Sequence, residues 1–164
     1  MKNVIVFDSS TLILLSKISL SRNVTNVTRC IITDIVEKEC TRKDTYDSKI
    51  IKELIKENLL ETVKTGQKEL VKIKKDFNIQ HGEASSLALA LKKRCILATD
   101  DKPTIKACII LNVDFSTAIH FVVRSYKTGL IDRQLALEKV SSLERYGRYN
   151  TRIIEDAKKK VEGD

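Results

Sequence analysis

Five carboxylates of this chain stand where they could share one site. Asp8 follows the apolar run VIVF, and Asp100 and Asp101 follow the stretch CILAT. Glu39 and Glu83 lie in helical stretches on the face that carries the apolar residues. A carboxylate on an apolar face is costly unless it is paired or bound to a cation. The five acids therefore indicate either buried ion pairs or a cation site.

A divalent cation is the chemistry that best suits such a group. Like charges in one cleft repel and raise each other's pKa, and a bound cation removes that cost. Ligand sets made only of oxygen suit Mg²⁺ or Mn²⁺, and such ions activate water and stabilise the leaving oxygen of a phosphodiester. With five of the 22 acidic residues in the site, 30 basic residues face the other 17, and this excess suits a nucleic-acid backbone.

Structural roles offer an alternative for each acid taken singly. Asp8 could cap a helix that begins near Ser9, and Asp101 could cap a helix that contains Pro103. Each glutamate could form a buried ion pair with one of the basic residues. These alternatives explain one acid at a time, whereas a metal site explains the set.

The elements that would position these acids alternate between strands and helices. Short apolar runs predict strands at 2–7, 30–32, 60–63, 95–98 and 112–115. Helical patterns are predicted at 9–19, 33–40, 47–58, 68–77, 82–94, 103–111, 117–127, 132–145 and 150–161. This alternation predicts an α/β fold with a parallel sheet covered on both faces and a site outside the carboxyl ends of the strands.

Length and composition favour one domain in a reducing compartment. The 164 residues are expected to form a single domain, 1–164, with the helices of about 116–164 packed on the same core. The four Cys form no CxxC pair, which disfavours structural zinc. The apolar run before Asp8 is too short for a signal peptide and no run is long enough to span a membrane, so a cytoplasmic protein without membrane contact is expected. His81 is expected to begin a helix, and His120 to lie in the core.

An ordered set of motifs resembles the PIN-domain ribonucleases. FDSSTLI, IVEKE, GEASSLALA and ILATDDK follow one another over roughly residues 3–125, and GLIDRQLALEKVSSLERYGRYN resembles the helical end of small prokaryotic PIN proteins, such as toxins of the VapC type. The resemblance implies a three-layer α/β/α fold with a central parallel sheet and extra C-terminal helices. It also implies a metal-dependent endoribonuclease that uses Mg²⁺ or Mn²⁺.

The resemblance also assigns the site residues. It implies catalytic roles for Asp8, Glu39, Glu83 and Asp101, with Asp100 as an accessory, and it implies that Asp8, Glu83, Asp101 and Asp100 hold the metal. Hydroxyl groups and lysines near the acids are expected to contact a ligand or substrate: Ser9, Thr11, Thr99, Lys102 and Lys106. Relatives often have a basic residue after the aspartate pair, in a DDxxxR pattern. Here Lys106 is expected to substitute for it, with poorer bidentate geometry toward phosphate.

Partners and competing functions follow from the same resemblance. RNA is the expected substrate, and an antitoxin protein and a second copy of the chain in a homodimer are expected partners. An RNA-processing nuclease without an antitoxin fits equally well. A phosphatase of the haloacid-dehalogenase type is disfavoured because Ser10 stands where its second Asp should be. The remaining alternative is a non-catalytic RNA-binding or adaptor module with a PIN fold.

Overall fold

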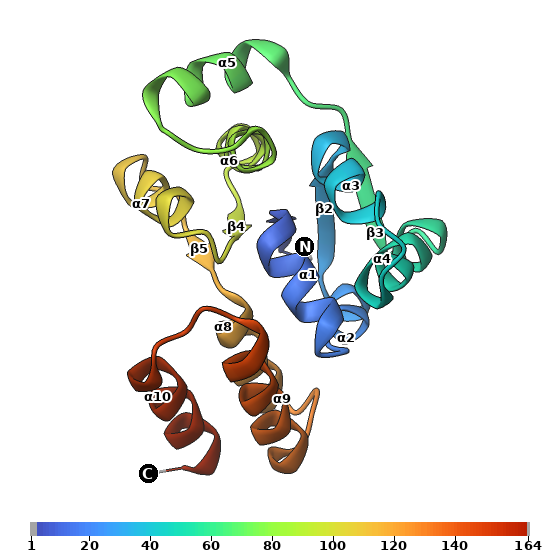
Figure 1. The fold of residues 1–164 in the computed structure, drawn as a ribbon, viewed down its shortest axis with the longest axis vertical. Helices are drawn as coiled ribbons and strands as arrows, with labels where there is room; N and C mark the ends of the chain where they lie inside the picture. The colour runs from blue at the N-terminus through green and yellow to red at the C-terminus, as the bar shows by residue number, and fades with distance from the viewer. Residues whose placement is uncertain (1–2, 164) are drawn as a thin grey trace.

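A parallel sheet forms the centre of the molecule. The computed structural model describes residues 3–163, and within them five strands are hydrogen-bonded in the order β3-β2-β1-β4-β5, all parallel (Figure 1). The strands are β1 (Val4–Phe7), β2 (Arg29–Thr33), β3 (Leu60–Val63), β4 (Ile96–Ala98) and β5 (Phe115–Ser116). The predicted parallel sheet is thus confirmed. The first strand was predicted from residue 2, which lies outside the described residues, and β5 lies a few residues later than predicted.

Helices cover both faces of this sheet, as predicted. They are α1 (Ser9–Lys17), α2 (Ser21–Val27), α3 (Asp34–Thr41), α4 (Tyr46–Lys56), α5 (Gln67–Asp76), α6 (His81–Lys93), α7 (Lys102–Ile110), α8 (Ala118–Lys127), α9 (Arg133–Tyr146) and α10 (Thr151–Glu162). Helix α2 was not predicted. Apart from Arg22, its sequence SRNVTNV consists of weak helix formers, so its burial of Val24 in the core accounts for the helix better than its propensity does.

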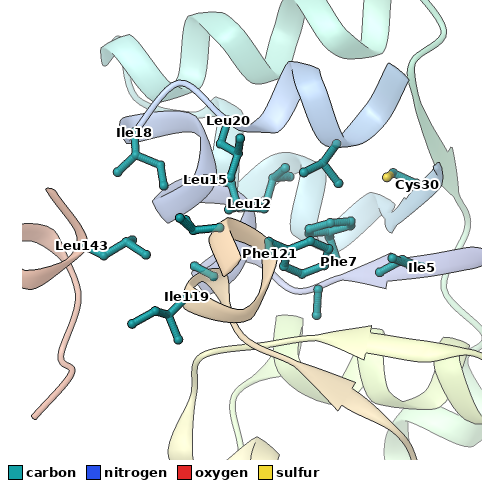
Figure 2. Close-up of a cluster of buried hydrophobic side chains, with 14 of the residues drawn as sticks. Ile5, Phe7, Leu12, Leu15, Ile18, Leu20, Cys30, Ile119, Phe121 and Leu143 are labelled. Atoms are coloured by element: carbon teal, nitrogen blue, oxygen red, sulfur yellow. The ribbon is translucent and has the colours of Figure 1, made fainter. Parts of the chain in front are cut away.

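The two faces of the sheet carry separate apolar clusters. Alternate residues of β1 point in opposite directions: Phe7 joins the cluster formed with α1 to α4 and α8 to α10, whereas Val6 joins the cluster formed with α5 to α7. Figure 2 shows the first cluster, in which the Phe7 and Phe121 ring centroids lie 5.4 Å apart. Three layers, helix on sheet on helix, follow from these two clusters.

The strand order changes direction between β1 and β4, two inner strands of the sheet. The chain runs outward from β1 to β2 and β3 and then crosses to β4 on the other side of β1. The helices that follow β1 and β4 therefore leave toward opposite faces, which opens a gap at the carboxyl ends of these two strands. Asp8 directly follows β1, and Asp100 and Asp101 follow β4 closely, so the topology brings them to this gap.

The C-terminal helices pack on the cluster that contains β1. Ile119 of α8 and Leu143 of α9 lie beside Leu15 of α1 in this cluster (Figure 2). His120 was predicted to lie in the core, and this was wrong. It is exposed, because α8 turns the neighbouring Ile119 and Phe121 inward. No helix among residues 3–163 combines the length and apolar character needed to cross a membrane.

Candidate active site

Asp8 is the most enclosed of the five acids. Its side chain is fully buried and begins α1, where Oδ1 accepts from the Ser9 amide at 2.7 Å. Oδ2 accepts from the hydroxyl groups of Ser10 and Thr99, each at 2.9 Å. The pKa of Asp8 is raised to about 6, mainly by burial and to a small extent by the charge of Glu39, while the three hydrogen bonds limit the increase. The capping role considered for Asp8 is therefore confirmed, and its place in a metal site stays a prediction.

Glu39 reaches the site from α3 and lies against the start of α6. Its carboxylate sits so close to Gly82 that a Cβ at that position would collide with it. The two helices are pinned together nearby, since the buried hydroxyl groups of Thr33 and Ser85 lie 2.7 Å apart. Thr33 also caps α3 by accepting from the Val36 amide. Glycine at 82 is thus the condition for the close approach of Glu39 to α6.

Glu83 lies close enough to three other acids to be affected by their charges. Its side chain is half-buried and accepts a hydrogen bond from the Gln80 amide, which closes a capping box at the start of α6. The pKa of Glu83 is raised to about 7, mainly by burial and to a smaller extent by the negative charges of Asp101, Asp8 and Glu39. Three of these acids lie at the starts of α1, α6 and α7, and Glu39 lies near the end of α3, so three other elements bring negative charge close to Glu83.

The two aspartates after β4 have different surroundings. Asp101 caps α7, where its Oδ2 accepts from the Thr104 amide at 2.9 Å and from the Thr104 hydroxyl at 2.6 Å. Asp100 instead accepts from the Thr11 hydroxyl at 2.5 Å, from the Ala118 amide at 3.0 Å and from the Tyr149 hydroxyl. The pair is therefore divided between the start of α7 and the C-terminal helices.

None of the five acids is neutralised by a basic partner in the described part of the chain. No lysine or arginine nitrogen there lies within 4.0 Å of their carboxylates, so the buried ion pairs considered as an alternative are absent. A donor set made only of oxygen atoms, with negative charge that no basic side chain neutralises, fits a hard divalent cation. Over residues 3–163, however, no three His, Cys, Asp or Glu side chains already stand at ligand spacing. Asp101 and Glu83 are instead turned toward the helices they cap.

The predicted substrate contacts fall into two groups. Thr11 and Thr99 are fully buried, and both donate to the aspartates, so the structure places them behind the acids. Ser9 is half-buried at the start of α1. Lys102 and Lys106 are exposed on α7, the helix that Asp101 caps. Of the five predicted contacts, Lys102 and Lys106 are the exposed ones.

Sequence reasoning missed residues that hold the acids in place. Ser10 links two of them, since it donates to Asp8 and accepts from the Asp100 amide at 3.0 Å. Gly82 and Tyr149 also touch acids directly. The sequence signal for Gly82 is a glycine in the first turn of a helix, where it costs stability unless a close contact requires it. Tyr149 lies 49 residues from its partner and carries no local signal.

Comparison with known proteins now identifies the class. The fold is a three-layer α/β/α arrangement with acids at the carboxyl ends of neighbouring parallel strands, and a family model described as "DUF3368: PIN domain" matches residues 4–162. The chain therefore belongs to the PIN-domain family. PIN domains have a nuclease-type fold, are generally nucleases and typically use divalent metals. The search of curated proteins finds no match.

Proposed function

We propose that this protein is an endoribonuclease that depends on Mg²⁺ or Mn²⁺ and hydrolyses RNA phosphodiester bonds at the acid cluster. The observation that carries the proposal is the mutual effect of four acids that lack basic partners. Holding such charges together without a cation is unfavourable, and a bound cation turns the same arrangement into a favourable one.

The residues divide the work of the proposed site between binding and orientation. Asp8, Glu39, Glu83 and Asp101 would hold the cation through their carboxylate oxygens. Hydroxyl groups and amides behind them fix Asp8 in one orientation. When bound, Mg²⁺ or Mn²⁺ supplies a water of lowered pKa and positive charge for the leaving oxygen.

The reaction is a hydrolysis that needs no other reactant. The oxygen of a water molecule forms a bond to phosphorus, the bond from phosphorus to one ribose oxygen breaks, and a proton ends on that leaving oxygen. The exposed Lys102 and Lys106 are suited to bind phosphates of the RNA near the start of α7. The overall excess of 30 basic over 22 acidic residues favours the same partner.

The test compares Asp8→Asn with a matched control, Asp114→Asn. Asp114 is exposed and precedes β5, at the opposite end of the sheet. Loss of a partner outside the ligand set of a metal site typically costs about 10–100-fold, so loss of a direct ligand is expected to reduce Mn²⁺-dependent cleavage of single-stranded RNA by about 100-fold or more. The control is expected to cleave like the native protein. Equal cleavage by Asp8→Asn would contradict the proposal.

A non-catalytic RNA-binding module is the second candidate. It is favoured by one observation, that no three acids of the described residues already stand at ligand spacing. RNA binding without cleavage, equal in the native protein and in Asp8→Asn, would establish it. Manganese titration of the native protein separates the two candidates further, since only the nuclease requires tight cation binding.

We also propose partners and a location for the nuclease. A second copy of the chain, an antitoxin protein and a cytoplasmic location all accord with the resemblance to small prokaryotic PIN proteins. Native mass spectrometry of the purified protein counts the copies. Co-purification from the source cell, followed by restored cleavage when a bound protein is removed, tests the antitoxin.

A further inference from the structure

One carboxylate at the site is bound by the protein from several sides. Asp100 accepts three hydrogen bonds, from Thr11 on α1, from the first amide of α8 and from Tyr149 between α9 and α10. Most of the acceptor capacity of a carboxylate is used by three such donors. Like Asp8, Asp100 is therefore held largely by donors of the protein, but two of its three donors, the Ala118 amide and Tyr149, belong to the C-terminal region.

Tyr149 is built into this position by the surrounding chain. Its hydroxyl donates to Asp100 and accepts from the Ile119 amide at 3.2 Å. Burial, together with the charge of Asp100, raises the pKa of the Tyr149 phenol above its usual range, so the proton needed for donation stays in place. A Cβ at Gly147 would collide with the Tyr149 ring, so glycine two residues earlier makes room for it.

A chain of hydrogen bonds connects this tyrosine to the most buried acid. Tyr149 fixes the Asp100 side chain, the Asp100 amide donates to Ser10, and Ser10 donates to Asp8 at 2.9 Å. Thr11, which follows Ser10 on α1, is held by the same Asp100 carboxylate. A displacement of Asp100 would thus be felt by both hydroxyl groups and by Asp8.

We propose that Tyr149 is a positioning residue of the nuclease site and that Asp100 acts with it, in place of the direct role in metal binding that the family resemblance implied for Asp100. Through these two side chains the C-terminal helices hold Asp8 in its binding orientation. The inference rests on the proposed function for its effect on metal and RNA. Its structural part, the coupling from Tyr149 to Ser10, is independent of that function.

The test replaces Tyr149 by Phe, which keeps the ring and removes only the hydroxyl. Tyr126→Phe is the control, since Tyr126 is half-buried on α8 against the same apolar cluster. A partner outside the ligand set of a metal site is worth about 10–100-fold in affinity or activity. We expect Tyr149→Phe to weaken Mn²⁺ binding about tenfold by calorimetry and to lower kcat by a similar factor. The KM for RNA is expected to change less than about twofold.

Asp100→Asn gives a second measurement on the same coupling. If Tyr149 acts through Asp100, the double variant loses no more Mn²⁺ affinity than the more affected single variant. Additive losses, or a native Mn²⁺ affinity and kcat in Tyr149→Phe, would overturn the proposal. An Asp100→Asn variant as impaired as Asp101→Asn would overturn the assignment of Asp100 as a positioning residue.

Hydrogen exchange without metal separates this inference from the proposed function. In Tyr149→Phe we expect two amides to exchange about tenfold faster or more. The Ile119 amide loses its acceptor, and the Asp100 amide donates to Ser10. Faster exchange at Ile119 alone would show that the loss of the Tyr149 hydroxyl does not reach Ser10, and it would refute the proposed coupling. If instead Asp8→Asn leaves Mn²⁺ binding and cleavage intact, the nuclease proposal fails, and the exchange result still decides the coupling.

Discussion

The strand-end aspartates and the helical glutamates reach the same cleft but are held in different ways. Asp8 and Asp100 each accept three hydrogen bonds from hydroxyl groups and amides. Glu83 accepts one from an amide, and Glu39 lies against Gly82. The protein therefore fixes the orientation of the aspartates by hydrogen bonds. The glutamates carry negative charge that few hydrogen bonds of the protein compensate.

The largest expected effect concerns the pH dependence of stability without metal. The pKa values of Asp8 and Glu83 are raised to about 6 and about 7, so the folded state binds their protons more tightly than the unfolded state does. Stability is then greatest at low pH within this range and falls as pH rises through 6 and 7. From pH 5 to pH 8 in a chelator, the loss is about 2 kcal/mol, or about 4–8 °C in Tm.

Differential scanning fluorimetry at both pH values measures this loss. Saturating Mn²⁺ at pH 8 is expected to restore the melting temperature, since the cation stabilises the ionised carboxylates. A metal-free protein that is equally stable at pH 5 and pH 8 would show that ionisation of Asp8 and Glu83 does not destabilise the fold.

A smaller effect is expected from Gly82→Ala, which alters only the glutamate side of the comparison. The added methyl group would displace the Glu39 carboxylate, and we expect cleavage to fall about tenfold, equivalent to about 1.4 kcal/mol. The melting temperature should change by less than about 2 °C, because alanine favours the helix and Glu39 can rotate away.

Gly66→Ala is the matched control for this steric effect. Gly66 precedes α5, and a Cβ there would meet the Glu69 carboxylate in the same manner, away from the acid cluster. It is expected to cleave normally. Loss of cleavage in both variants, or in neither, would mean that contact with Gly82 does not place Glu39.

The smallest expected effect is a gain in stability from Glu83→Gln. Glutamine retains the capping box and removes a half-buried charge that three other acids oppose. At pH 8 without metal we expect the melting temperature to rise by about 2–4 °C, or about 1 kcal/mol, after allowance for the exposure of the side chain. Glu69→Gln, at the equivalent position of α5, should leave it unchanged. A lower melting temperature for Glu83→Gln would indicate that its charge is stabilised by the protein.

The reach of sequence reasoning can be judged from particular residues. Asp8 and Asp101 were placed correctly near strand ends because an acid that follows a short apolar run marks the carboxyl end of a parallel strand, where the next helix begins. Glu39 and Glu83 were placed on helices because their spacing from apolar residues is local. The helix α2 was missed, since tertiary burial of Val24 overrides weak propensity there. Tyr149 was missed because its contact depends on how α8 to α10 pack against α1.

If the acid cluster depends on Tyr149, its acids are synthesised before the residue that positions one of them. A ribosome adds roughly 5–20 residues per second, so Asp101 is synthesised a few seconds before Tyr149. During that interval the growing chain contains every acid of the cluster but lacks the tyrosine whose hydroxyl donates a hydrogen bond to Asp100. A chain that terminates prematurely after residue 120 would likewise have all the acids, but its Asp100 would lack the hydrogen bond from Tyr149. If Tyr149 positions Asp100 as proposed, the acid cluster would reach its final arrangement only after α8 to α10 have been synthesised and have packed against α1.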